Sequence, residues 1–142
     1  MLNRNALLAG WIGLLLSIVS LMGCEMMAHF DARTHQQTKR VEKVLFQHFD
    51  FLAMMPEQER NFRRFEVDYL NIDVEIQQLV RMQSLRPSNL LMTQTTEQFA
   101  LHWQEDRRLH QRNNVLTDKE ISEAVERYRK IFDLLLQPPV AE

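Results

Sequence analysis

Glycine is confined to the first 23 residues of this chain. Its three glycines are Gly10, Gly13 and Gly23, and the residues that follow contain none. Turns between β-strands often need glycine because it adopts positive φ angles without steric cost, whereas glycine destabilises a helix. Leucine, methionine, glutamate, glutamine and arginine are frequent instead, and all five favour helices. The chain after residue 23 is therefore predicted to be all-α.

Four segments of this region carry apolar residues at helical spacing. Pro56, Pro87, Asn113-Asn114 and Pro138-Pro139 mark their ends, since proline and the residue before it disfavour helix continuation. Such segments with short connections pack best as an antiparallel up-down four-helix bundle, here following an N-terminal hydrophobic signal or anchor helix. The predicted inward stripes are Val41, Val44, Leu45, His48, Leu52 and Met55; Phe62, Phe65, Tyr69, Ile72, Ile76, Leu79 and Gln83; Leu91, Thr95, Phe99, His102, Asp106, Leu109 and Asn113; and Ile121, Val125, Tyr128, Phe132 and Leu135.

Local signals place some of the helix ends. Glu57-Gln58-Glu59 after Pro56 is predicted to be the first turn of the second helix, because acidic residues suit a helix N-terminus. Ser88 is predicted to cap the third helix. Thr117 and Glu120 have the spacing of a capping box at the start of the fourth.

The N-terminus has the three parts of an export signal. Arg4 supplies positive charge, residues 6–22 form an uncharged and mainly apolar run, and Gly23 is a small residue before a possible cleavage site. With Leu21, Gly23 and Cys24 at matching positions, residues 1–24 resemble the signal peptide and lipobox of bacterial lipoproteins. The resemblance indicates where the protein is targeted but implies no biochemical activity.

The resemblance implies a covalent diacylglyceryl group and an N-acyl chain on Cys24, two anchors that together attach a protein stably to a membrane. Glu25 occupies the position where aspartate favours inner-membrane retention, so the periplasmic face of the outer membrane is preferred. The alternative is an uncleaved anchor, because the apolar run is close to the length of a spanning helix. Both options place the rest of the chain at a membrane surface outside the cytoplasm.

The resulting organisation has four parts. Residues 1–23 are the signal peptide, residues 24–40 are the lipidated N-terminus with a polar tether or the start of the first helix, residues 41–137 are the helical bundle, and residues 138–142 are a tail. Cys24 is the only cysteine, so no disulfide can form within one chain. The chain has 17 basic and 19 acidic residues, a balance that argues against a nucleic-acid partner.

His102 and Asp106 are the candidate residues for chemistry in the third segment. They lie one helical turn apart, so a carboxylate could orient an imidazole that binds a metal or moves a proton. Two ligands are too few for a metal site, and the other interpretation is a polar layer inside the bundle. The helical rise places this layer near Tyr69, Asp73 and Tyr128. We therefore predict no metal and no other cofactor, and keep the His102–Asp106 site as the alternative.

Aromatic residues suggest a surface for a partner protein. Phe46 and Phe49 lie beside the apolar stripe of the first segment, and Trp103 lies beside that of the third. Exposed aromatic patches mark interfaces. The alternative is a wide core packed around large rings.

No nucleophile–base pair or phosphate-binding loop is evident, so an enzyme is not expected. The predicted function is that of a membrane-tethered, non-enzymatic lipoprotein that acts as an accessory or assembly subunit of a cell-envelope complex, in the manner of a pilotin. Its partners would be the membrane and another envelope protein. The alternative is a periplasmic bundle that senses a ligand or metal through His102 and Asp106.

Overall fold

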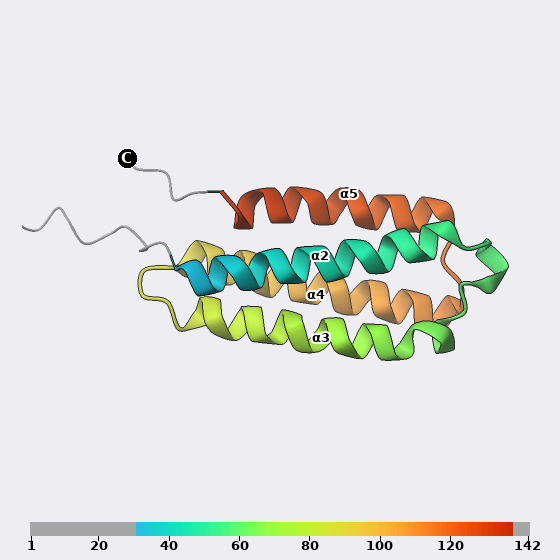
Figure 1. Ribbon diagram of the computed structural model, residues 1–142, viewed down its shortest axis with the longest axis horizontal. Coiled ribbons are helices and arrows are strands. Elements are labelled where there is room, and N and C mark those ends of the chain that lie inside the picture. Colours follow the sequence, from blue (N-terminus) through green and yellow to red (C-terminus); the bar gives the residue numbers. More distant parts are fainter. Residues whose placement is uncertain (1–30, 138–142) are drawn as a thin grey trace, which may run out of the picture.

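The computed structural model describes residues 31–137, which form four long helices and one short 3₁₀ helix (Figure 1). No strand occurs among these residues, so the all-α prediction is confirmed. The predicted signal or anchor at residues 1–23, Cys24 and the tail at 138–142 lie outside the described residues. The elements are α2 (Ala32–Met54), η1 (Glu57–Glu59), α3 (Phe62–Ser84), α4 (Leu90–Asn113) and α5 (Asp118–Leu135).

The four helices lie side by side and alternate in direction (Figure 1). Helices α2 and α4 each pack against both α3 and α5. We call the end of the bundle that contains Asp31, the α3–α4 connection and Gln137 the terminal pole. The distal pole is the opposite end, which contains η1 and the α4–α5 connection. Both ends of the described chain therefore lie at one pole.

The core forms where three of the predicted stripes meet. All seven predicted residues of α3 are buried, as are most of those in α2 and α5. Burial of one large apolar side chain stabilises a fold by about 1.5–3 kcal/mol, so these stripes supply the main driving force. The largest fully buried side chains are Trp103, Tyr69, Tyr128, Phe49, Phe65, Phe99, Phe132, Leu45, Leu52, Ile76, Leu79 and His110.

Helix α2 begins at Ala32, so residues 32–40 belong to the bundle and are no tether. The side chain of Asp31 caps this end by accepting from the backbone N–H groups of Arg33 at 3.1 Å and Thr34 at 3.4 Å. Thr34 and Thr38 are buried on its inner face. The polar composition of this segment did not decide between a tether and a helix. The cap at Asp31 explains why α2 starts at Ala32.

Helix α4 turns a different face to the core from the one predicted. Thr96, Phe99, Trp103 and His110 are buried, whereas His102 and Asp106 are only half-buried. The predicted stripe and the observed buried face share Phe99, but the observed face is rotated about the helix axis by about one residue position. Burying the indole ring of Trp103 removes more apolar surface from water than any other choice in this helix, which accounts for the rotation.

Two of the predicted helix ends were wrong and one is confirmed. Residues 57–59 form a 3₁₀ helix, and α3 starts only after the cap Asn61, whose side chain accepts from the backbone of Arg64 at 3.3 Å. Ser88 has a φ of 52°, and Asn89 is the residue at the cap position of α4. Thr117 and Glu120 form the predicted capping box.

Candidate functional site

The side chain of Arg60 joins three segments at the distal pole. It is buried, and its Nε donates to the carbonyl of Met55 at 2.9 Å while Nη1 donates to that of Leu116 at 3.1 Å. Its Nη2 lies 2.7 Å from the carboxylate of Asp118. The guanidinium therefore satisfies carbonyls at the end of α2 and before α5. Sequence analysis missed this role, because nothing in the sequence separates Arg60 from the other arginines nearby.

His110 uses both ring nitrogens inside the core. Its Nε2 lies 2.6 Å from the carbonyl oxygen of Arg60, which can only accept, so the proton is on Nε2. Its Nδ1 therefore accepts from the hydroxyl of Tyr69 at 2.9 Å. Burial lowers the pKa of His110, although the bond to Arg60 opposes this shift. The ring is thus held neutral as part of a link between α3 and α4.

His48 lies among aromatic rings in the middle of the core. Its ring centroid is 4.7 Å from that of Tyr69 and 5.7 Å from those of Phe65 and Trp103, all in edge-on geometry. Neither of its nitrogens has a hydrogen-bond partner within the described part of the chain. Burial lowers the pKa of His48 to about 3, with a smaller contribution from His110. His48 is therefore a neutral ring at physiological pH.

Asp73 and the indole of Trp103 join α3 to α4. The Nε1 atom of Trp103 donates to Asp73 at 2.6 Å, and Arg107 forms an ion pair with the same carboxylate. The Asp73 carboxylate satisfies the indole N–H of Trp103. Because this carboxylate is only partly buried and is paired with Arg107, its negative charge is not left unpaired in the core.

Asp106 links α4 to α5, and His102 is not part of this link. The carboxylate of Asp106 accepts from Arg127 at 2.7 Å and from the hydroxyl of Tyr128. Burial and the negative charge of Asp106 raise the pKa of Tyr128. His102 lies toward solvent, 3.5 Å from Glu105. The predicted polar layer therefore contains Asp106 and Tyr128 in direct contact, whereas His102, around which it was expected, pairs with Glu105 and not with Asp106. Among residues 31–137, no three His, Cys, Asp or Glu side chains lie together in a way that could hold a metal ion.

The predicted aromatic patch does not exist as an exposed surface. Phe49 and Trp103 are each 1% exposed and contact each other edge-on at 6.3 Å. Phe46 is half-buried and lies 5.9 Å from the ring of Phe132. These three residues belong to a wide core because the rotated α4 brings its indole toward α2. The alternative of a wide core was the correct one.

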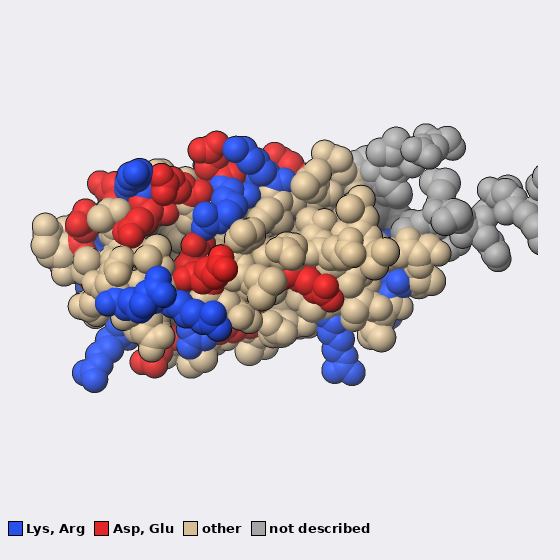
Figure 2. Space-filling model, turned by 180° about the vertical axis from the view of Figure 1, so that it is seen from behind, with Lys and Arg blue, Asp and Glu red and all other residues tan. Residues whose placement is uncertain are grey.

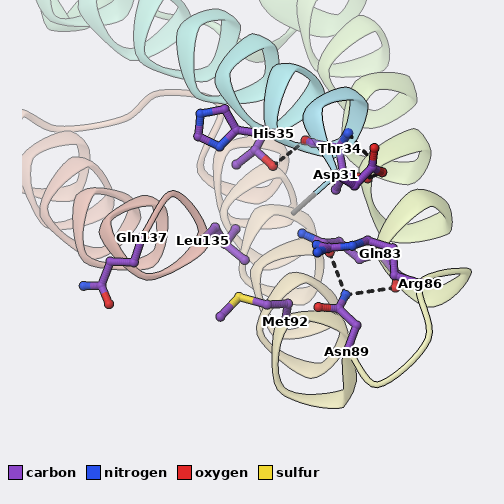
Figure 3. A pocket seen from close by; sticks show the side chains of 10 residues that line it. Asp31, Thr34, His35, Gln83, Arg86, Asn89, Met92, Leu135 and Gln137 are labelled. Atoms are coloured by element: carbon purple, nitrogen blue, oxygen red, sulfur yellow. Dashed lines mark hydrogen bonds between the residues drawn. The ribbon is translucent and has the colours of Figure 1, made fainter. Parts of the chain in front are cut away.

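A small pocket opens at the terminal pole (Figure 3). It has a volume of about 110 Å³, and its lining includes Asp31, Thr34, Gln83, Asn89 and Met92. The Nδ2 atom of Asn89 donates to Gln83 Oε1 at 2.7 Å, whereas the buried Oδ1 atom of Asn89 has no hydrogen-bond partner among the described residues. A hydrogen bond from Thr34 lowers the pKa of Asp31. The pocket has room for a small polar group or water.

The outer side of α3 carries a second, exposed apolar row. Val67, Leu70 and Val74 follow one another at spacings of three and four, so they share one face of the helix. They are 66%, 49% and 66% exposed, on the side opposite the buried stripe. Sequence analysis missed this row because the inner stripe of α3 was already complete.

Comparisons with known proteins add no family to this description. No protein-family model matches the chain, and searches of curated proteins and of solved structures found no match either. Among residues 31–137, no helix is both long and apolar enough to cross a membrane. The class that the described residues define is an all-helical bundle with a polar network inside it.

Proposed function

We propose that this protein is a lipid-tethered, non-enzymatic subunit of a cell-envelope complex, which holds a partner protein through the outer face of α3. The lipidation signal that ends at Cys24 supports the tether. The exposed row Val67, Leu70 and Val74 supports the partner surface and is the observation on which the proposal rests. The preferred location remains the periplasmic face of the outer membrane.

The row is unusual for a helix that has already buried one face. A surface helix normally shows charged and polar residues opposite its core stripe, and an apolar second face indicates a second partner. Three adjacent aliphatic side chains without a covering element leave a continuous apolar strip exposed to water. Removal of such a strip from water is what drives association.

Charge narrows the class of partner. On the same face of α3, Arg63 lies four residues before Val67 and Arg81 lies seven residues, or two helical turns, after Val74, and both are exposed. No acidic residue lies within the row itself. The complementary surface would therefore be an apolar strip with acidic residues at its two ends.

Site-specific photo-cross-linking in membranes tests this proposal. A photo-reactive amino acid at Leu70 should give one defined adduct with an envelope protein, because its side chain is at the centre of the row. Substitution of Val67 and Val74 by glutamate should abolish that adduct and lower function in cells, while the thermal unfolding of the protein stays unchanged.

Leu101 provides the matched control. It is an aliphatic residue on α4 that is 51% exposed, similar to Leu70. A photo-reactive group at Leu101 should give no such adduct, and Leu101→Glu should leave the adduct at residue 70 intact. Equal cross-linking from both positions, or an adduct that survives Val67→Glu with Val74→Glu, would contradict the proposed surface.

A further inference from the structure

Exposed leucines gather at the terminal pole. Leu85, Leu90 and Leu91 lie at the α3–α4 connection and are 75%, 70% and 68% exposed, and Leu134 near the end of α5 is 51% exposed. They are separate from the row on α3, which lies along the side of the bundle. These four leucines expose apolar side chains at one end of the bundle, and nothing in the described chain covers them.

Basic side chains predominate in the segment that carries Leu85, Leu90 and Leu91, although Asp31 lies at the same pole and lines a pocket with Arg86. Residues 76–96 contain no Asp or Glu, whereas Arg81 and Arg86 flank Leu85. Arg86 also donates to Gln83 at 3.0 Å, so its guanidinium is held at the mouth of the α3–α4 connection. In the view of Figure 2, the end of the molecule beside the grey atoms is largely uncharged, and the acidic and basic side chains concentrate toward the other end. Leucines beside arginines suit the boundary between acyl chains and anionic headgroups.

The length of chain ahead of Asp31 determines what this pole can reach. Asp31 lies seven positions after Cys24, and a fully extended chain over seven residue steps spans at most about 25 Å. Helix α2 has 23 residues and is about 35 Å long. A lipid on Cys24 therefore holds the terminal pole near the bilayer, whereas the distal pole can stand well away from it.

We propose that the terminal pole is a second membrane contact, in which Leu85, Leu90 and Leu91 insert among lipid headgroups and the exposed Arg81 faces anionic phosphates. The occupant of this surface is a lipid bilayer. The proposal rests on the membrane tethering of the proposed function. A tether raises the effective concentration of the pole at the bilayer, so a contact that is weak by itself persists.

This contact sets the orientation of the bundle. With the terminal pole on the bilayer, α3 stands away from the membrane and its row of Val67, Leu70 and Val74 faces the aqueous space. A tether alone would leave the bundle free to tilt and to press the row onto lipid. The leucine pole therefore keeps the proposed partner surface accessible.

Depth-dependent fluorescence quenching of the full-length protein tests the contact. Ser88→Cys places a label at the tip of the α3–α4 connection, and Gln58→Cys places the same label in η1 at the distal pole. The labelled proteins are reconstituted into vesicles of phosphatidylcholine and phosphatidylglycerol, some of which carry brominated acyl chains. We expect several-fold stronger quenching at residue 88 than at residue 58.

Two sets of substitutions separate the leucine contact from mere proximity. Leu85→Ser, Leu90→Ser and Leu91→Ser together should bring quenching at residue 88 down toward the level at residue 58. The matched control is Val67→Ser, Leu70→Ser and Val74→Ser, which removes as many exposed aliphatic side chains elsewhere and should leave the quenching unchanged.

Sedimentation with the same vesicles distinguishes the two proposals. If the protein sediments but residues 88 and 58 are quenched equally, the tether stands and the leucine contact is wrong. A label at residue 88 that stays unquenched on pure lipid would show that the leucines do not enter the bilayer, which also overturns the proposal. If the protein does not sediment, tethering fails and the contact fails with it.

Discussion

The hydroxyl of Tyr69 donates to Nδ1 of His110 across the interface between α3 and α4, at a distance of 2.9 Å. The opposite nitrogen of the same ring bonds to the carbonyl of Arg60. Together these bonds fix one tautomer of a fully buried imidazole. The core of this bundle thus contains two imidazole rings, His48 and His110, that burial keeps neutral. The stability of the protein should therefore depend on pH.

The free energy of unfolding should fall steeply in acid. Burial lowers the pKa of His48 from its ordinary value of 6.5 to about 3 in the folded protein, and it lowers the pKa of His110 as well. The unfolded chain therefore takes up protons below pH 6.5 that the folded chain excludes, so stability is complete above this pH and is lost as the pH falls toward 3. Between these two pKa values His48 contributes a slope of about 1.4 kcal/mol per pH unit, and His110 adds a contribution of the same sign.

His48→Phe should reduce this slope, since phenylalanine fits among the surrounding rings and does not titrate. Urea unfolding at several pH values between 6.5 and 4 provides the measurement. Phe49→Leu is the control, because it weakens the core without removing an ionisable group and should leave the slope unchanged. The same slope in the wild type and in His48→Phe would contradict the account of the buried ring.

Arg60→Met should destabilise the protein by about 3 kcal/mol. The substitution leaves the buried carbonyls of Met55 and Leu116 without donors, and each unsatisfied group costs about 1–3 kcal/mol. Arg63→Met provides the control, because Arg63 is exposed and surface changes typically stay within about 0.5 kcal/mol. Denaturant unfolding measures both, and equal effects would show that the buried guanidinium has no special role.

Phe49→Ala should cost about 3–5 kcal/mol, as for other buried aromatic residues. Phe51→Ala, two residues further along α2, should cost less, because Phe51 is 51% exposed. Thermal unfolding of the two variants provides the comparison. If Phe49→Ala left the melting temperature unchanged, the wide core that replaces the predicted aromatic patch would be wrong.

The sequence correctly predicted the buried face of the helices that have strong apolar periodicity. For α4, which has weak periodicity, it predicted the helix but the wrong buried face. Helix α3 has seven inward residues in an unbroken pattern, and all of them are buried. Helix α4 has fewer apolar residues and longer polar runs, so two faces one residue apart fit its pattern almost equally. Tertiary packing of Trp103 decided between them, and this information is not local to α4.

The candidate sites were harder to predict for the same reason. The burial of Arg60 depends on backbone carbonyls from two distant segments, at Met55 and Leu116. The exposed row on α3 could have been found by scanning its outer face for a second stripe. The leucines at the terminal pole become a surface only once the direction of each helix is known, because Leu134 and Leu90 are far apart in sequence.

The lipid attachment should depend on one atom, the sulfur of Cys24. Cys24→Ser removes the acceptor thiol, so the variant should lack the lipid mass and accumulate in the membrane as unprocessed precursor. Immunoblotting of fractionated cells after a short expression pulse would measure this. Normal processing of the variant would mean that the resemblance to the lipobox is misleading.

The central claim is that the bundle works as a lipid-tethered protein, and intact-mass spectrometry of the wild-type protein from bacterial membranes tests it most directly. The account predicts a mature chain that begins at Cys24 and carries the added mass of one diacylglyceryl group and one N-acyl chain. A chain whose mass shows residues 1–23 still attached, or an unmodified Cys24, would contradict it.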